Sequence, residues 1–405
     1  MRRVERPACV FPSRRGDRLR FGSTTGIRGN RDQGTGNDEG ACNGESDKNA
    51  MNPQAMVSET GNLDLRGTTM RLVRGENLSR TEAANFLDAL LDPVATDTQI
   101  AAALIALTAK GETVDELAGM AEAMRERATP LHSPHERFID TAGTGSSAAK
   151  WFNVSTAAAF VIAGAGLPVS KHGARAASSK SGSADVLEAL GVNAVASPET
   201  MGRCLNEHGI CFMFAPQFHR ATARVAQVRR QLGVHTTFNL LGPLTNPARA
   251  PFQLLGVWDH SLVERVASAL VLLGIKQAWV VHGADGLDEV TTSRDTFVAA
   301  CSARCGVETF TISPEDFGLE RRSLNGCHPE GPIESARLIH GILNGNQTDN
   351  FSVARDLVVI NAAAALYLTG VAADPRRAAA AACESIDSGR AMSKLDALIR
   401  ETNWT

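Results

Sequence analysis

Segments with the pattern of buried strands alternate with segments of helical periodicity from residue 137 onward. The strand patterns lie at 138–140, 167–173, 252–258 and 277–283, and the helical patterns lie at 155–165, 181–191 and 262–274. This alternation predicts a mostly parallel sheet flanked by helices, because two parallel strands need a long crossover connection that usually holds a helix. We therefore expect an α/β fold, with a large α/β domain over residues 136–405.

Three helical segments precede this region, and each begins with a capping box. The capping pairs are Ser79 with Glu82, Thr96 with Gln99, and Thr113 with Glu116. In such a box each side chain accepts a hydrogen bond from the backbone amide of the other residue. The three segments predict a small all-helical N-terminal domain over 69–135, to which helices around 218–245 are a candidate addition. For the later helix at 181–191, Ser181 or Ser183 is the expected N-cap.

Residues 1–68 differ from the rest of the chain. They are rich in Arg, Gly, Asn, Ser and Asp and lack apolar periodicity, which is typical of disordered segments. They hold no apolar stretch typical of a secretory signal, and acidic residues such as Glu5 and Asp17 are atypical of an organelle transit peptide. We expect a disordered extension, within which Met51 and Met56 are alternative starts.

Charge, hydropathy and cysteine content narrow the class of protein. The chain has 41 Lys and Arg against 44 Asp and Glu, so it lacks the basic excess of a general nucleic-acid binder. Its most apolar stretches, such as 157–167 and 266–273, are shorter than the roughly 20 residues of a membrane span. Eight cysteines without the regular spacing of a disulfide scaffold favour a reducing, cytoplasmic location. A zinc site at Cys301 and Cys305, with Cys327 and His328, is a weaker alternative to small core residues.

Two neighbouring loops follow predicted strands and carry groups that suit phosphate. Gly143-Thr144-Gly145 precedes a helix that begins near Asn153, so backbone amides converge at a positive helix end; alone, this pattern also fits a tight turn. The second loop carries Lys171, His172, Arg175, Ser178, Ser179, Lys180 and Ser183. Ligands of open α/β sheets bind at the carboxyl ends of strands, so the two loops predict one anionic substrate. The alternative for the second loop is a solvated polar segment.

Two further segments carry charged pairs. Asp288 and Glu289 follow a strand and a glycine-rich turn, where two hard carboxylates are suited to Mg²⁺ beside substrate phosphates; a chance acidic surface turn has the same pattern. His282 is expected to pack or to hydrogen-bond at the strand end. Arg229 and Arg230 lie in a helical segment, and either could recognise a carboxylate with two hydrogen bonds. Only one of them can face inward, because helical neighbours point about 100° apart.

Five motifs in this order and spacing resemble the anthranilate phosphoribosyltransferase family. They are "GTGSSAAKWFNVSTA", "KHGARAASSKSGSADVLEALG", "FAPQFHRA", "VRRQLGVHTTFNLLGPLTNP" and "HGADGLDEV". The resemblance runs from about Met70 to near the C-terminus. It implies a homodimer with the fold of the pyrimidine nucleoside phosphorylases, and phosphoribosyl transfer from 5-phosphoribosyl 1-diphosphate (PRPP) to the anthranilate amine with one or two Mg²⁺ ions.

The resemblance also assigns site residues. The positions that match PRPP-binding residues are Gly143, Ser146, Ser147, Trp151, Asn153, Val154, Ser155, Thr156, Lys171, His172, Gly173, Ala174, Arg175, Ala176, Ala177, Ser178, Ser179 and Ser183. Gly143, Ala174 and Arg229 match anthranilate-binding positions, and Ser155, Asp288 and Glu289 match magnesium positions. No residue is named as the general base, since an amine is already a nucleophile; Lys171 and His172 are the candidates for a direct catalytic contact.

Two departures from the family pattern concern the acceptor and the ribose. The family usually reads Gly-Thr-Gly-Gly-Asp where this chain has Gly145-Ser146-Ser147, and Lys-His-Gly-Asn-Arg where this chain has Ala174. One lost hydrogen bond to a charged group is worth about 1.5–3 kcal/mol, so activity with weaker acceptor binding is expected. Another aromatic acceptor, a pyrimidine nucleoside phosphorylase and a non-catalytic nucleic-acid-binding relative stay open as alternatives.

Overall fold

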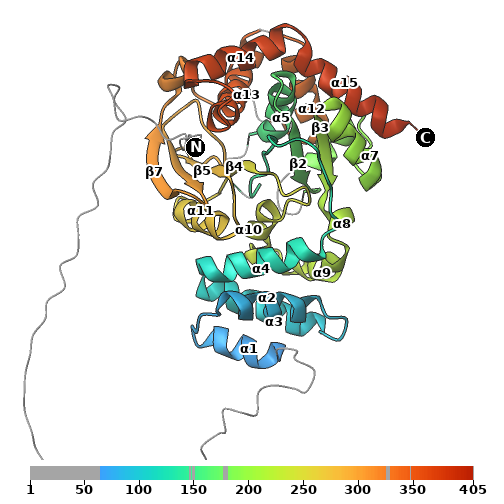
Figure 1. Cartoon of the computed structure of the whole chain (residues 1–405), viewed down its shortest axis with the longest axis vertical. Coiled ribbons are helices and arrows are strands. Elements are labelled where there is room, and N and C mark those ends of the chain that lie inside the picture. Colours follow the sequence, from blue (N-terminus) through green and yellow to red (C-terminus); the bar gives the residue numbers. More distant parts are fainter. Residues whose placement is uncertain are drawn as a thin grey trace, which may run out of the picture.

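Seven strands form one mixed sheet in the order β3-β2-β1-β4-β5-β6-β7 (Figure 1). The computed structural model describes residues 64–404 except 146, 148–150, 177–180, 325–328 and 347. The strands are β1 (Ile139–Asp140), β2 (Val169–Gly173), β3 (Ile210–Phe214), β4 (Phe252–Gly256), β5 (Gln277–Gly283), β6 (Thr296–Ser302) and β7 (Gly306–Ile312). The pairs from β3 to β5 are parallel, whereas β6 and β7 are antiparallel additions at one edge. The expected mostly parallel sheet is confirmed, with a hairpin whose short connection leaves no room for a crossover helix.

Helices connect the parallel strands and cover both faces of the sheet. The connecting helices are α5 (Val154–Gly164), α6 (Ser183–Ala189), α7 (Pro198–Arg203), α8 (Ala215–Phe218), α9 (Ala223–Leu232), α10 (Thr237–Leu244) and α11 (Leu262–Leu272). The C-terminal helices are α12 (Pro332–Leu343), α13 (Asp349–Leu368), α14 (Pro375–Asp387) and α15 (Arg390–Asn403). Because successive side chains of a strand alternate in direction, Trp279 and Val281 face the core formed with α5 and α13, and Ala278 and Val280 face the core formed with α11.

The long helix α13 belongs to the interior of the protein. Among the described helices, its segment Phe351–Leu368 is the one with the length and mean hydropathy of a membrane span. Burial decides its role, because 67% of this segment lies inside the protein. It packs against α5 and α14 in the core on one face of the sheet.

A helical bundle lies below the sheet in Figure 1. It consists of α1 (Leu65–Val73), α2 (Arg80–Leu91), α3 (Asp97–Lys110) and α4 (Val114–Arg127). All three predicted capping boxes are present at the starts of α2, α3 and α4. Helix α1 was not expected and corrects the boundary of the extension, since residues 65–68 are helical. Asp64 caps it by accepting the amides of Arg66 and Gly67, and Leu72 anchors it in the bundle core.

The N-terminus of α6 differs from the prediction. Gly182 is the N-cap residue, in place of Ser181 or Ser183. Asp185 stabilises this end because its Oδ2 accepts the amides of Gly182 and Ala176 at 3.0 and 2.9 Å. This carboxylate supplies the reciprocal bond of a capping box, since it accepts the amide of the N-cap residue, and its charge is favourable at the helix start.

Candidate active site

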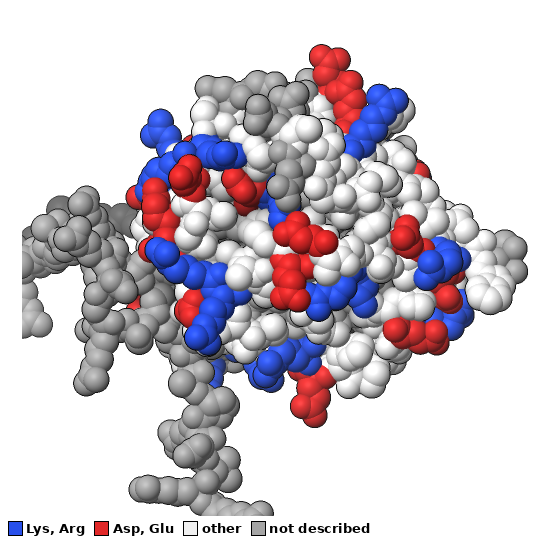
Figure 2. Space-filling model, turned by 90° about the horizontal axis from the view of Figure 1, so that it is seen from above, with Lys and Arg blue, Asp and Glu red and all other residues white. Residues whose placement is uncertain are grey.

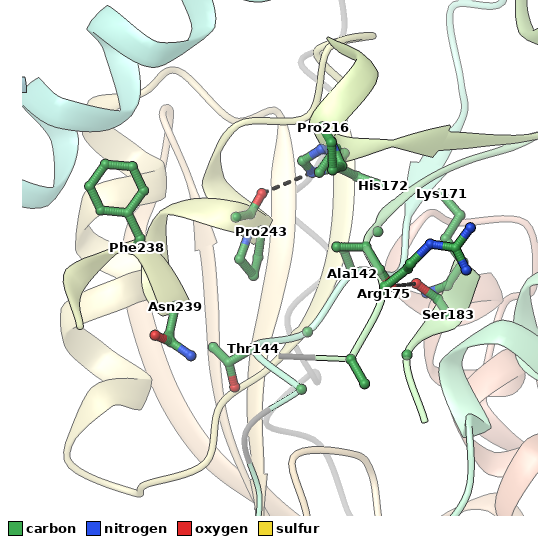
Figure 3. A pocket seen from close by; sticks show the side chains of 18 of the residues that line it. Ala142, Thr144, Lys171, His172, Arg175, Ser183, Pro216, Phe238, Asn239 and Pro243 are labelled. Carbon is green, nitrogen blue, oxygen red and sulfur yellow. Dashed lines mark hydrogen bonds between the residues drawn. The ribbon is translucent and has the colours of Figure 1, made fainter. Parts of the chain in front are cut away.

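A cavity of about 320 Å³ opens at the carboxyl edge of the parallel strands (Figure 3). Its walls come from the loops after β1, β2 and β5, from helices α9 and α10, and from Met124 of α4. The cavity thus lies where the sheet meets the helical bundle. This is the edge at which both polar loops of the sequence were expected to meet.

Most of the residues predicted for the site line this one cavity. They are Gly143, Asn153, Ser155, Thr156, Lys171, His172, Gly173, Ala174, Arg175, Ala176, Ser183, Arg229, Asp288 and Glu289. Ser147, Trp151 and Val154 are buried residues outside its lining. Ser146, Ala177, Ser178 and Ser179 lie outside the described residues.

Asn153 joins the first polar loop to the second. It precedes α5, and its side-chain Oδ1 accepts hydrogen bonds from the hydroxyls of Ser181 at 2.9 Å and Ser335 at 3.0 Å. Its Nδ2 also donates to the carbonyl of Ser181. The side chain is used in this cross-link and makes no cap bond to α5. The amides at the start of α5 are thereby held beside the second loop.

Lys171 places a cation at the base of the cavity. Its side chain extends from β2 and is almost fully buried. The Nζ atom donates to the Ser155 hydroxyl at 3.2 Å and to the Thr141 carbonyl at 3.3 Å. The ammonium group therefore links the ends of β1 and β2 to the first turn of α5, where an anion is attracted by both the charge and the helix end.

The acidic pair faces the same loops. Asp288 Oδ2 accepts the amide of Gly145 at 2.9 Å, and Glu289 Oε1 accepts the amide of Ser155 at 3.3 Å. The turn approaches β4 so closely that a Cβ atom on Gly256 would lie 1.6 Å from the Asp288 carbonyl oxygen. Only glycine fits at this point. Asp288 is buried and both carboxylates line the cavity, so the pair does not lie on an exposed surface turn.

His282 and the described cysteines take no part in the cavity lining. His282 Nδ1 hydrogen-bonds to the Val257 carbonyl at 2.9 Å, as expected for a strand-end residue. Cys301 is a buried free thiol in β6, and Cys305 is disulfide-bonded. Within the described part of the chain no group of three or more His, Cys, Asp or Glu side chains is arranged to hold a metal ion. The zinc alternative thus has no support from Cys301 and Cys305; Cys327 and His328 lie outside the described residues.

Helices α9 and α10 form the wall opposite the second loop. Arg229 of α9 is half-buried and lines the cavity, whereas Arg230 is exposed. The Arg229 Nη2 atom donates to Asn239 Oδ1 at 3.0 Å, and the guanidinium lies 5.5 Å from the centre of the Phe238 ring. Burial lowers the pKa of Arg229 to about 10, which leaves it charged at neutral pH.

Two imidazole rings that line the cavity lie against each other. The rings of His172 and His219 are 5.2 Å apart in an edge-to-face arrangement. Burial is the main cause that lowers the pKa of His172 to about 3 and that of His219 to about 4. His172 Nδ1 lies 3.0 Å from the Gly242 carbonyl, so Nδ1 carries the proton and Nε2 is a hydrogen-bond acceptor. Neutral His172 is a poor proton acceptor near pH 7.

Sequence reasoning missed a buried carboxylate beneath these loops. Asp140 at the end of β1 is fully buried and accepts the amides of Ala142 at 2.9 Å and His172 at 3.2 Å. Burial raises its pKa, while the hydrogen bond from Asn246 and the charge of Lys171 act in the opposite direction. An acidic residue at the end of an apolar strand pattern was the available signal. His219, Asn239 and Asn246 were likewise present in quoted motifs without an assigned role.

Comparisons with known proteins agree over nearly all of the described chain. A family model described as "Glycosyl transferase family, a/b domain" matches residues 135–392, and one described as "Glycosyl transferase family, helical bundle domain" matches residues 68–128. The anthranilate phosphoribosyltransferase of Moorella thermoacetica is 48% identical over 335 residues, which cover 83% of this chain and 97% of that protein. The protein of the same name from Anaeromyxobacter dehalogenans is 49% identical over 333 residues, 82% of this chain and 97% of that protein.

Solved structures give the same result. The crystal structure of anthranilate phosphoribosyltransferase from Thermus thermophilus superposes with a TM-score of 0.76 at 39% identity, covering 83% of this chain and 99% of that one. The enzyme of the same name from Saccharomyces cerevisiae, in complex with PRPP and Mg, also superposes with a TM-score of 0.76, at 29% identity, covering 85% of this chain and 99% of that one. Identity of this level across both domains, together with the family models, leads to one conclusion: the chain belongs to the anthranilate phosphoribosyltransferase family.

Proposed function

We propose that this chain transfers the phosphoribosyl group of PRPP to the amine of anthranilate, giving N-(5-phosphoribosyl)anthranilate and diphosphate. This reaction is the second step of tryptophan biosynthesis from chorismate. One observation carries the proposal: a single cavity joins two loops suited to phosphate, an acidic pair and a charged arginine. It therefore offers partners to a diphosphate, to a divalent cation and to a carboxylate at the same time.

The donor half of the cavity suits the departure of diphosphate. As the bond from ribose C1 to the diphosphate oxygen breaks, negative charge grows on the leaving group. Lys171 and the amides at the start of α5 lie where they stabilise that charge without moving. The nitrogen of the acceptor then forms the new bond to C1 and loses one proton, which passes to the departing diphosphate or to water.

Asp288, Glu289 and the Ser155 hydroxyl fit a magnesium site. They are hard oxygen donors, and Mg²⁺ is commonly held by one or two carboxylates together with substrate phosphates. Among the described residues no third acidic or histidine side chain joins the two carboxylates, and such a pair suits this mode better than a closed metal cage. When bound, the ion neutralises charge on the diphosphate. The chain's own residues place the carboxylates, through the amides of Gly145 and Ser155.

The acceptor half is assigned to the space between the α9 and α10 wall and the facing residues of the second loop. Arg229 supplies the cation for the anthranilate carboxylate, and His172 Nε2 supplies an acceptor for a polar hydrogen. Ala174 lines the second loop with a methyl group, so the amide of the usual family asparagine is absent there. No side chain is assigned as a general base, because the pKa values of His172 and His219 lie far below neutral.

We further propose a cytoplasmic homodimer that does not bind nucleic acid. Met70 and Val73 of α1 and Ile105 of α3 are exposed apolar side chains on two helices that pack together, which favours pairing of two bundles. On the face shown in Figure 2, basic side chains are interspersed with acidic ones, unlike a phosphate-binding surface. Four of the five described cysteines are free thiols, which favours a reducing compartment, although Cys305 is disulfide-bonded. Light scattering on the eluting peak of a sizing column tests the dimer.

We also propose that α9 and α10 belong with the bundle as one helical domain. Val225 and Val228 of α9 and Leu241 of α10 share a core with Phe86 of α2 and Leu104 of α3. The same core continues to the face of the sheet that α11 covers.

A nucleoside phosphorylase of the same fold is the second candidate, and one assay separates the two. Purified chain is incubated either with PRPP, anthranilate and Mg²⁺ or with thymidine and phosphate, and the products are identified by mass spectrometry. We expect N-(5-phosphoribosyl)anthranilate from the first mixture alone. Thymine from the second mixture would identify the activity as phosphorolysis of a nucleoside and contradict the proposed transfer.

A further inference from the structure

Arg229 is held by a neutral side chain. Within the described residues it forms no ion pair, and its hydrogen-bond partner is the amide oxygen of Asn239 at 3.0 Å. Its buried Nε atom has no hydrogen-bond partner among those residues. A half-buried guanidinium of this kind keeps a full positive charge and unused donor capacity for a ligand.

The oxygen of Asn239 is fixed by the start of α10. Asn239 is the third residue of the helix, and its Oδ1 also accepts the amide of Thr236 at 3.0 Å as part of a capping box. The same helix start is tied to the bundle, because the Thr237 hydroxyl donates to Glu112 Oε1 at 2.6 Å. The oxygen that Arg229 contacts therefore has little freedom to move.

Asn239 also faces the cavity. It lines the cavity together with Arg229 and Phe238, and Figure 3 shows its amide directed toward Thr144 of the first loop. The ring of Phe238 lies beneath the guanidinium, 5.5 Å away. The Phe238 ring and the Asn239 amide oxygen together fix the plane of the guanidinium. A guanidinium that lies over an aromatic ring and donates a hydrogen bond to a fixed oxygen can no longer rotate freely.

An amide and a carboxylate at position 239 have opposite consequences for the charge of the Arg229 guanidinium. A carboxylate would orient Arg229 equally well and cap α10 equally well, but it would form a buried ion pair and neutralise the guanidinium. The amide orients Arg229 while its charge stays available.

We infer that Asn239 is a positioning residue that directs Arg229 toward the carboxylate of the acceptor without neutralising it. This inference rests on the proposed function. According to the inference, the Arg229 and Asn239 pair selects for an anionic acceptor. This selection does not depend on the side chain at position 174.

The Asn239→Asp variant tests the inference, with anthranilate and its neutral amide, 2-aminobenzamide, as ligands. Both affinities are measured by fluorescence titration of the full chain in the presence of PRPP but without Mg²⁺, so that turnover does not consume the ligand, and KM is measured for anthranilate and for PRPP with Mg²⁺ present. We expect anthranilate to bind at least about tenfold more weakly, since a charge-assisted hydrogen bond is lost. Binding of 2-aminobenzamide and the KM for PRPP are expected to stay within twofold.

Two further variants keep the result interpretable. Gln99→Glu makes the same amide-to-carboxylate change at the third residue of α3, in an intact capping box away from the cavity, and is expected to leave every value unchanged. Asn239→Ala removes the orienting oxygen but leaves the charge of Arg229, and is expected to weaken anthranilate less than Asn239→Asp does.

Three outcomes contradict the inference. Unchanged anthranilate affinity in Asn239→Asp overturns it, as does equal weakening of anthranilate and 2-aminobenzamide, which would indicate a general disturbance of the pocket. A wild-type chain that binds no anthranilate overturns the proposed function and this inference together, and is recognised before any variant is measured.

Discussion

Asn246 donates a hydrogen bond of 2.7 Å from its Nδ2 atom to Oδ2 of Asp140 in the interior of the protein. The same Nδ2 atom donates to the Ser170 carbonyl at 2.9 Å. Asn246 lies two residues beyond α10, and the other oxygen of Asp140 holds the amides of Ala142 and His172. This pair therefore connects the α10 wall of the cavity to both polar loops.

The first prediction concerns this connection. In the Asp140→Asn variant the new side-chain amide has one oxygen that accepts hydrogen bonds, whereas both oxygens of the Asp140 carboxylate accept them. One buried donor therefore loses its partner. We expect the free energy of unfolding to fall by about 1–3 kcal/mol and the turnover to fall with it. Urea denaturation measures the first effect. Asp396→Asn on the exposed side of α15 is the matched control, and an Asp140→Asn chain as stable as this control contradicts the role of Asp140.

The second prediction concerns the acidic pair. With Asp288 and Glu289 both replaced by Ala, the cavity loses two hard oxygen ligands, and Mg²⁺-dependent turnover is expected to disappear. Fluorescence depletion of anthranilate across a Mg²⁺ titration measures the loss. PRPP binding without metal is expected to persist through Lys171. Turnover equal to that of the wild type would refute the metal assignment.

The third prediction concerns the departure at Ala174. This residue is exposed to the cavity, and its backbone oxygen accepts the amide of Ala184 at 3.2 Å, so the loop does not depend on its side chain. Ala174→Asn adds an amide that reaches the acceptor side, and we expect the KM for anthranilate to fall several-fold with little change for PRPP. Steady-state kinetics measure this change. An unaltered KM for anthranilate would mean that another group already makes the contact that the asparagine amide was expected to add.

The fourth prediction concerns pH. In the native state burial holds the pKa values of His172 and His219 at about 3 and about 4, below the ordinary value of 6.5. The unfolded chain therefore binds protons that the native protein does not bind between about pH 6.5 and pH 3. The resulting contribution to stability is complete above pH 6.5 and is lost as the pH falls. The free energy of unfolding, measured by denaturation at pH 7, 6, 5 and 4, should show this decline. Its slope against pH should be smaller in the His219→Gln variant. Equal slopes in the two proteins would contradict the assignment.

Local sequence signals predicted much of the fold for a physical reason. Capping boxes such as Thr96 with Gln99 depend on residues three apart, and the alternation of strand and helix patterns sets the parallel sheet. The cap of α6 was missed because Asp185 reaches back from inside the helix to Gly182. The antiparallel pairing of β6 with β5 was not predicted, since it is a tertiary contact.

The candidate site was predictable in its parts and not in its connections. Each polar loop was visible as a motif, and the rule on strand ends brought the loops together. The Asp140 and Asn246 pair is separated by 106 residues, and the contact of Arg229 with Asn239 depends on how α9 turns onto α10. Such contacts follow from packing, which local patterns do not encode.

The most direct test of the proposed function is the depletion of anthranilate fluorescence by the purified chain. The assay contains PRPP, Mg²⁺ and anthranilate, and each is omitted in turn. We predict depletion that needs PRPP and Mg²⁺ together, with formation of diphosphate in equal amount. Absence of depletion in the complete mixture, with PRPP still bound, would contradict anthranilate as the acceptor.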